Sequence, residues 1–395
     1  MFHFELYEFY IELYRLISNY NERYDMTLSR RQMISLIGGG TVVAASSAAA
    51  GFLFTRTPHI ALAPWDAAGG YPDPRLNALS YALLAPNPHN LQPWKVALEG
   101  EDGVALYHDV SLRLPETDPQ DRQITIGMGC FLEQMVLAAG AAGYAVDLAL
   151  YPEGENEGLP IARARFTEGG AVDSLAREIP NRRSCKEPFQ DKPVPNVLAN
   201  ELEMFADVYN DAATVEALKA LTWDAWMVEA MTSRTMQESV DLMRFGKAEI
   251  NASPDGIDLG GPFLESLMLA GMLKREDQND PSTVGFQQGV AIYKEMLAAT
   301  PAYVALTSPD NSRAAQIEAG RRWLRLNLKT TQLGLALHPV SQCLQEYPEM
   351  APHYDAAHKL LAGSGRTVQM LGRLGYGPEV PATPRWPLEA KLLNA

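Results

Sequence analysis

The sequence predicts an α+β protein built from two similar halves. Segments with helical patterns alternate with short apolar runs that are typical of strands. A helix that ends at a glycine and leads into a strand occurs twice, at residues 129–143 and 320–334. Two polar motifs, one in each half, lie at residues 85–94 and 181–189, and neither has the composition of a packed core.

The first half should begin with a helix and a β-hairpin, because the sequence EGEDG between two apolar runs is a turn signal. A long apolar helix and two further strands should follow. The elements expected here are helices at 73–84 and 127–146 and strands at 94–98, 104–107, 147–152 and 163–166.

The second half should be mainly helical at first, from about residue 194 to residue 245. The run AYVALTS at 302–308 predicts a buried strand, and residues 311–337 predict a long helix that ends near Gly334. Residues 250–285 interrupt the helical region with Gly, Pro and Asp.

The recurring unit suggests a fused pseudo-dimer. Its two copies run from Gly129 to Gly143 and from Gly320 to Gly334, and we expect the strand WKVAL before the first to correspond to AYVAL before the second. This divides the chain into halves at 64–180 and 181–395. The alternative is a coincidence between two ordinary helix–turn–strand units.

Composition excludes several classes of function. The chain has 395 residues and a formal net charge of −15, which argues against nucleic acid as a partner because such binding needs clustered Lys and Arg. The three cysteines lie far apart and form no metal-ligand pattern, so no metal site is expected. No phosphate-binding P-loop and no H-E-x-x-H motif occurs, and G-x-G-x-x-G has only a poor match.

The N-terminal region resembles an export signal. Arg30 and Arg31 precede an uncharged small-residue run at 34–54, which is the layout of a twin-arginine signal over residues 26–63. Residues 1–25 are either an upstream extension from a misassigned start or an amphipathic helix. We expect the twin-arginine translocase as a partner and a periplasmic location, or a membrane tether on the outer side of the inner membrane if the signal is retained. The alternatives for the run at 34–54 are a buried helix and a single membrane span.

The motif at 181–189 is suited to binding an anion. Arg182, Arg183 and Lys186 offer charge-assisted donors, and Ser184 offers a hydroxyl. A basic loop is unusual in so acidic a chain, although a solvated charged turn would have the same composition.

Four segments together resemble the FMN-dependent nitroreductases. The sequences APNPHNLQPW and RRSCKEPF are similar to the A-P-S-x-x-N-x-Q-P-W and R-R-S-x-[RK]-x-F motifs of that family, GLALHPVSQ to its segment beneath the flavin, and PRWPLEAKL to its C-terminal ending. The order of the motifs and the export signal resemble the Acg-like branch, a fused single-chain version of the homodimer. The resemblance covers most of residues 72–395 and implies a three-layer α/β/α nitroreductase-like fold.

The resemblance also implies one composite FMN site per chain, because each half has kept one complementary motif. Arg182, Ser184 and Arg385 would bind the phosphate, and Arg183 or Lys186 would lie near N1 and O2 of the flavin ring. The remaining contacts would come from the asparagine loop and from the segment beneath the ring: Pro86, Asn87, Asn90, Pro339, Val340 and Ser341.

The function expected from the resemblance is flavin-dependent oxidoreduction of a small molecule, with substrate and electron donor unspecified. The resemblance to the Acg-like branch also implies that residues 250–285 form a lid over the flavin. The alternative function is therefore a lidded protein that stores FMN without turnover. A third possibility is a chain that has lost flavin binding altogether.

Overall fold

The computed structural model describes residues 55–363 and 365–394. The predicted extension at 1–25 and the paired arginines of the predicted export signal lie outside the described residues. Helices and sheets are both present in quantity, and the expected α+β class is confirmed.

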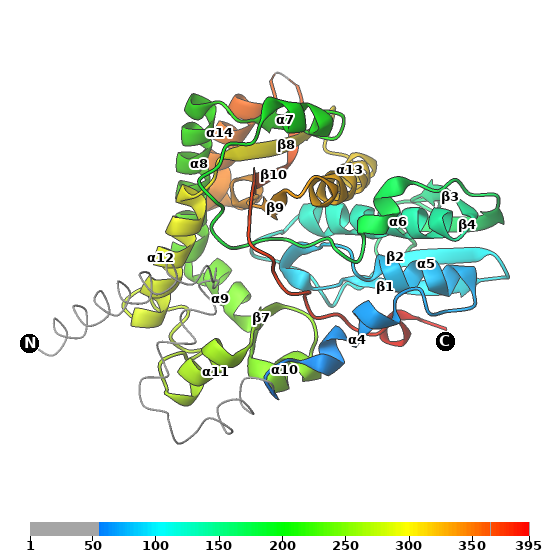
Figure 1. Ribbon diagram of the computed structural model, residues 1–395, viewed down its shortest axis with the longest axis horizontal. Helices are drawn as coiled ribbons and strands as arrows, with labels where there is room; N and C mark the ends of the chain where they lie inside the picture. The colour runs from blue at the N-terminus through cyan, green and yellow to red at the C-terminus, as the bar shows by residue number, and fades with distance from the viewer. Residues whose placement is uncertain (1–54, 364, 395) are drawn as a thin grey trace, which may run out of the picture.

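The first half holds one of the two larger sheets (Figure 1). Its elements are α4 (His59–Ala67), α5 (Pro74–Ala82), the 3₁₀ turn η1 (Pro88–Asn90), β1 (Trp94–Glu99), β2 (Gly103–His108), α6 (Arg122–Ala141), β3 (Tyr144–Leu150), β4 (Ala162–Glu168) and η2 (Ser174–Glu178).

The second half contains more helices. Its elements are α7 (Asn196–Leu202), β5 (Asp207–Tyr209), α8 (Ala212–Met231), α9 (Ser233–Asp241), β6 (Met243–Phe245), α10 (Gly246–Ala252), β7 (Ile257–Leu259), α11 (Pro262–Leu269), α12 (Val284–Ala298), β8 (Ala302–Ser308), α13 (Arg313–Gln332), β9 (Ala336–Pro339), η3 (Gln342–Leu344), η4 (Pro348–Met350), α14 (Ala351–Leu361), β10 (Thr367–Gly375) and η5 (Leu388–Lys391).

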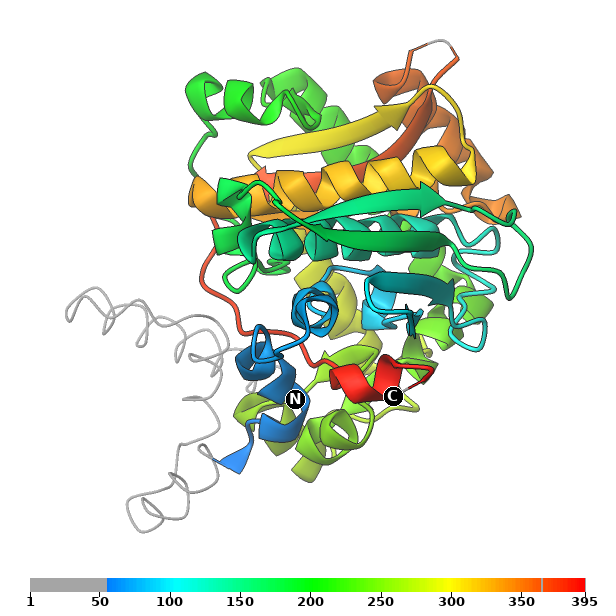
Figure 2. The same ribbon diagram turned by 90° about the vertical axis from the view of Figure 1, so that its right-hand side faces the viewer.

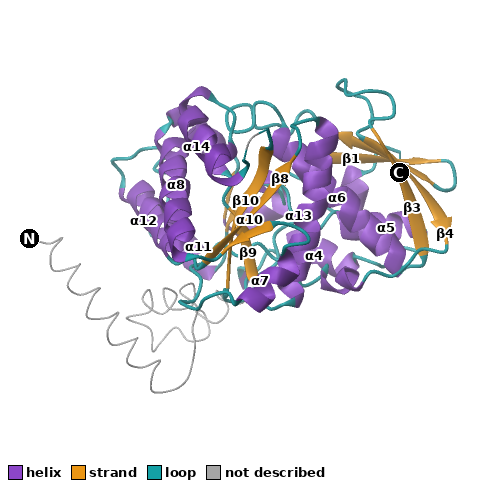
Figure 3. Cartoon of the chain, turned by 90° about the horizontal axis from the view of Figure 1, so that it is seen from above, coloured by secondary structure: helices purple, strands orange, loops and turns teal. Residues whose placement is uncertain are grey.

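The two larger sheets have the same strand topology. The orders are β1-β2-β4-β3 and β5-β8-β10-β9, and all neighbouring strands are antiparallel. The segment between α9 and α11 adds a small parallel pair, β6 and β7. Seen from above, α8, α12 and α14 cover one side of the second sheet, and α13 and α6 lie between the two sheets (Figure 3).

Burial along the strands follows from this layering. All seven residues of β8 are buried, as expected for an apolar strand with helices on both faces. In β3, half-buried and exposed residues alternate, because that strand has helices on one face only and lies at a sheet edge. α6 is the helix among the described residues that is long and apolar enough to cross a membrane, but 89% of its most apolar window is buried inside the protein.

The two long helices, α6 and α13, pack against each other through glycines. A Cβ on Gly129 would lie 2.1 Å from the Ile317 carbonyl oxygen, and one on Gly320 would lie 1.9 Å from that of Ile126. Only glycine permits so close an approach of two backbones. Each helix is followed by a glycine with positive φ, Gly143 at 86° and Gly334 at 69°. The recurring glycines thus mark equivalent positions of two equivalent helices.

One correspondence between the halves was predicted wrongly. The strand equivalent to AYVALTS (β8) is β2. β8 pairs with β10, the second strand after α13, and β2 pairs with β4, the second strand after α6. The predicted partner WKVAL is β1, which occupies the position of the short strand β5. The short strands β5, β6 and β7 were not predicted, because three residues carry too little periodicity to be distinguished from a loop.

The C-terminal segment returns from the second half to the first. Figure 2 shows it, in red, passing from β10 down to the region of α4. Leu392 forms a parallel bridge with Val96 of β1, and the Leu393 N–H donates to the Val96 carbonyl at 2.8 Å. The Asn394 side chain hydrogen-bonds both the N–H and the carbonyl of Leu98. The outer edge of β1 is therefore covered by this segment.

Candidate functional site

The loop at residues 85–94 adopts a strained backbone. His89, Asn90 and Gln92 have φ values of 47°, 55° and 53°, in the left-handed region that non-glycine residues seldom occupy. Asn and His tolerate this region better than most residues, which accounts for part of the composition of the loop. Three such residues within four positions persist only when their surroundings hold them, and such strain is typical of functional sites.

The polar side chains of the loop supply much of that support. Asn87 Oδ1 accepts from the Gln92 N–H at 2.8 Å, and Asn87 Nδ2 donates to the Ala85 carbonyl. Gln92 is fully buried; its Nε2 donates to the Pro254 carbonyl at 2.7 Å, and its Oε1 accepts from the Trp386 N–H at 2.9 Å. The predicted flavin contact of the Asn87 side chain stays a prediction: each polar atom has one partner within the loop, and the amide has a second N–H.

Two buried arginines from different segments converge on this loop. Arg182 donates from Nη2 to the Leu84 carbonyl at 2.9 Å and from Nη1 to Asn327 Oδ1 at 3.0 Å. Arg385 donates from Nη2 to the same Leu84 carbonyl at 3.2 Å, and from Nη1 to Asn90 Oδ1. The structure therefore brings together the three segments that were predicted to share a site.

Arg385 uses its donors within the protein. Its Nε donates to the Leu83 carbonyl at 2.9 Å, and further bonds from the guanidinium reach Thr383, Pro384 and Ala85. It can lend positive charge to a nearby anion, but the direct phosphate contact that was predicted for it requires some of these bonds to break.

Arg182 and Arg183 carry donors that the described residues leave unused. Each Nε is buried without a hydrogen-bond partner there, and the half-buried Ser184 hydroxyl has no partner there either. Burial, followed by the neighbouring charge of Arg183, lowers the pKa of Arg182 to about 10, and burial also lowers that of Arg183. A pKa of about 10 leaves the Arg182 side chain charged at neutral pH. The result is a concentration of positive charge with free donors.

Trp65 of α4 contributes an aromatic surface to the same place. The Arg183 guanidinium carbon lies 4.6 Å from the centroid of its ring and that of Arg385 lies 5.8 Å away, which are cation–π distances. The indole Nε1 donates to the Thr383 carbonyl at 2.8 Å. Burial, followed by the charge of Arg182, lowers the pKa of Arg385 to about 9.

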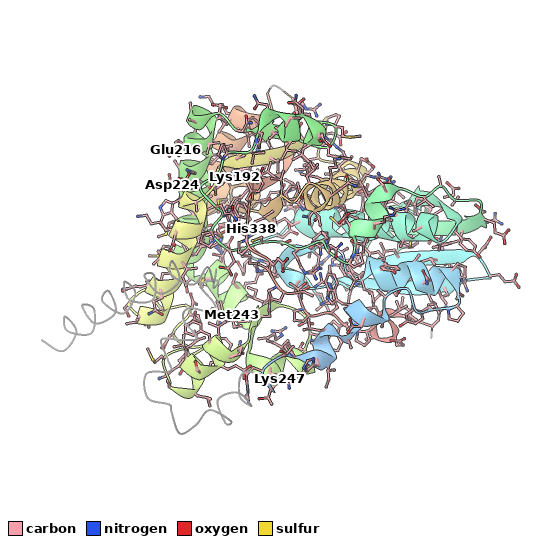
Figure 4. All side chains as sticks on the ribbon, in the orientation of Figure 1. Lys192, Glu216, Asp224, Met243, Lys247 and His338 are labelled. Carbon is pink, nitrogen blue, oxygen red and sulfur yellow. The ribbon has the colours of Figure 1, made fainter. Side chains whose placement is uncertain are left out.

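Lys186 lies at the opposite end of the arginine motif. The Cys185 N–H donates to the Leu337 carbonyl at 3.1 Å, which places exposed Lys186 beside His338 of β9. Burial, and then the charge of Lys186, lowers the pKa of His89 to about 4; burial, Arg373 and Lys186 lower the pKa of His338 as well. One ammonium group thus acts on a histidine from each half. Figure 4 shows His338 in the middle of the molecule, well away from Lys247 near its lower edge.

The segment predicted to run beneath the flavin is only partly available. The Val340 N–H donates to the Leu371 carbonyl at 2.9 Å, and the Val340 side chain packs in the core, so this residue offers no free donor. Pro339 has no N–H. The Ser341 hydroxyl is paired with the backbone of Leu371, whereas its N–H has no acceptor among the described residues. If a backbone donor serves a ligand here, it is that of Ser341.

Part of the predicted lid lies directly against the asparagine loop. The Gly256 N–H donates to the Asn90 carbonyl at 3.2 Å, and Trp386 Nε1 donates to Asp255 Oδ2 at 2.9 Å. These bonds connect the segment between α10 and β7 to both the loop and the C-terminal segment. That residues 250–285 act as a lid stays a prediction.

Comparison with known proteins finds relatives that match most of the chain. No protein-family model matches the chain. From Mycobacterium tuberculosis, "Putative NAD(P)H nitroreductase Rv3131" is 24% identical over 326 residues, 78% of this chain and 87% of the relative. From the same organism, "Putative NAD(P)H nitroreductase acg" is 25% identical over 329 residues, 79% and 93%. Over most of its length the chain is therefore similar to proteins that are named putative NAD(P)H nitroreductases.

Similarity to solved nitroreductases is weaker. The FMN-dependent nitroreductase NfnB from Mycobacterium smegmatis, solved in complex with NADPH, is similar with a TM-score of 0.35 and 16% identity. The match covers 55% of this chain and 96% of that one.

Several side chains at this site were not predicted from the sequence. Trp65, Asn327 and Arg373 contact predicted site residues or their neighbours, yet each lies in a segment that reads as ordinary helix or strand. His338 lies in the segment GLALHPVSQ, but no role was predicted for it. Isolated side chains of this kind have no motif of their own, and only the fold places them at the site.

Proposed function

We propose that this protein is an FMN-dependent oxidoreductase that holds one flavin per chain between its two halves. The observation that carries the proposal is the pair of buried Nε donors on Arg182 and Arg183 that have no partner among the described residues. The relatives named as nitroreductases support the same reading.

The residues present fit a phosphate. Two guanidinium groups and the Ser184 hydroxyl offer donors, and no carboxylate raises the pKa of Arg182 or of Arg183. A phosphate dianion would satisfy the unused donors and would be stabilised by charge-assisted hydrogen bonds worth about 1.5–3 kcal/mol each. Trp65 and Arg385 would complete the wall and add a third positive charge.

The other end of the site fits the flavin ring. Bound FMN would supply hydride or electron transfer to a small molecule. Lys186 would hold positive charge near the pyrimidine edge, where reduction builds negative charge, and so favour the reduced form. The Ser341 N–H would be a backbone donor from beneath the ring. The strained asparagine loop, fastened by Gln92, would position the ring edge from the other half.

The test is a visible spectrum of protein purified after expression with ample riboflavin. We expect about one FMN per chain, because each half has one of the two complementary motifs. The bound flavin should bleach on reduction and regain its colour when a nitro compound is added without oxygen. NADH, NADPH and dithionite are compared as reductants. Two flavins per chain, or none, would refute the composite site.

A matched pair of variants tests the phosphate end. Arg182→Ala should weaken FMN binding by ~10-fold or more while changing riboflavin binding less, because one charge-assisted bond to phosphate is lost. Arg177→Ala removes an exposed arginine from the preceding turn and should change neither affinity. Equal loss of both flavins in Arg182→Ala would show that Arg182 acts on the fold rather than on phosphate.

We further propose that the protein is exported in folded form by the twin-arginine route. The support is the pair Arg30 and Arg31 ahead of the small-residue run. Changing both to lysine should leave the protein in the cytoplasm, as followed by fractionation and immunoblotting. Unchanged export of this variant would favour a plain membrane anchor.

A further inference from the structure

A buried arginine fixes the protonation of a histidine in the second half. Arg373 of β10 is fully buried, and its Nη1 lies 3.2 Å from His338 Nδ1. A guanidinium group only donates hydrogen bonds. His338 Nδ1 must therefore accept, and the single proton of the neutral imidazole is on Nε2.

The environment excludes the other forms of the imidazole. An Nδ1–H tautomer would set two donors against each other, and an imidazolium would add a second buried positive charge next to Arg373 and Lys186. Burial and these two cations lower the pKa of His338 well below its usual value. Arg373 is itself held in place, because its Nε donates to Thr300 Oγ1 at 2.8 Å and its Nη2 to the Glu187 carbonyl at 3.2 Å.

The Nε2–H of His338 is available to a ligand. His338 is 5% exposed, and its Nε2 forms no hydrogen bond with the described residues. The Cys185–Leu337 backbone bond sets the arginine motif beside β9 at this point, and Arg373 binds the backbone immediately after Lys186. Two donors of different kinds, one neutral and one cationic, thus lie side by side.

We propose that His338, held by Arg373 as the Nε2–H tautomer, is a fixed hydrogen-bond donor that acts with Lys186 on the carbonyl-bearing pyrimidine edge of the flavin. This assignment rests on the proposed function. Arg373 is then a positioning residue: it touches no ligand and acts by fixing the tautomer and the ring orientation of His338.

The first experiment reads the tautomer directly from the ¹⁵N signals of the histidine side chains in the full chain, with His338 assigned by its loss in His338→Gln. We expect Nε2–H in the wild type without added flavin, and a mixture of forms in Arg373→Met. A wild-type Nδ1–H or imidazolium signal at pH 7 would overturn the proposal.

The second experiment measures FMN affinity. His338→Phe should bind FMN about tenfold more weakly, and His338→Gln, whose Nε2 can donate from a similar position, should remain within about twofold of the wild type. His59→Gln, at an exposed histidine, is the control. Wild-type affinity in His338→Phe would refute the donor role. If the wild-type protein binds no FMN, the proposed function and the flavin contact of His338 are both refuted. The ¹⁵N measurement of the His338 tautomer, in the wild type and in Arg373→Met, would then still show whether Arg373 fixes it.

Discussion

The contact between α6 and α13 gives a sharp test of how the two halves are held together. In Gly129→Ala the new Cβ would lie 2.1 Å from the Ile317 carbonyl oxygen and 3.0 Å from the Gly320 Cα. Both are backbone atoms, so no side chain can rotate away. Restoring an ordinary contact of 3.4 Å from 2.1 Å requires the two helices to separate by about 1.3 Å. Such overpacking costs about 3 kcal/mol.

Alanine also favours a helix over glycine by about 1 kcal/mol, so we expect a net loss of about 2 kcal/mol in the free energy of unfolding. The assay is equilibrium denaturation by urea, followed by circular dichroism. Gly289→Ala in α12 is the matched control: nothing lies within 4 Å of its added Cβ, and the substitution should stabilise by about 0.5–1 kcal/mol. A Gly129→Ala protein as stable as the control would refute the close packing of the halves.

Three further predictions concern the site and the core. Gly127→Ala places a Cβ 3.2 Å from Asn87 Cβ and from Pro88 Cδ, so it should shift the strained loop and weaken FMN binding about tenfold in a fluorescence titration while costing under about 1 kcal/mol of stability. Lys186→Ala should lower the flavin reduction potential, measured by dye equilibration; an unchanged potential would exclude the role given to this lysine.

The third prediction is a change in pH dependence. Burial raises the pKa of Glu229 from 4.5 to about 7, so between these values the native state holds a proton that the unfolded chain has released, and stability falls as pH rises. Glu229→Gln should remove this dependence. Between pH 5 and pH 8 the free energy of unfolding of the variant should therefore rise by up to about 3 kcal/mol relative to that of the wild type. Parallel pH profiles of the two proteins would refute the role given to Glu229.

The sequence predicted several long and regular elements well, although the longest strand, β10, was not predicted. The strand at 302–308 and the helices now described as α5, α6 and α13 have strong apolar patterns and glycine boundaries, which are local properties. The equivalence of strands was predicted wrongly because WKVAL and AYVAL look alike in sequence, whereas the place of a strand in a sheet depends on distant partners. Local composition contains no information about such pairing.

The residues of the site were also predicted only in part. The arginine motif, the asparagine loop and Arg385 were expected together, and the structure brings them together; their role in binding FMN stays a prediction. One expected detail changed, since the Val340 N–H is used inside the protein. The flavin contact of Asn87 stays a prediction, because only one of its two amide N–H donors is used within the loop. The pairing of His338 with Arg373 could not be foreseen, because it joins single residues of two strands through the sheet register.

The edge of β1 has a consequence for the order in which the molecule forms. The strand lies near the start of the described chain, and among the described residues its outer edge is paired with residues 392–394. During synthesis the first sheet therefore stays open at that edge until residue 394 has left the ribosome. An uncovered edge strand is a template for pairing with other chains. A nascent chain should accordingly be exposed to pairing with other chains until residues 392–394 have been made and have reached the edge of β1.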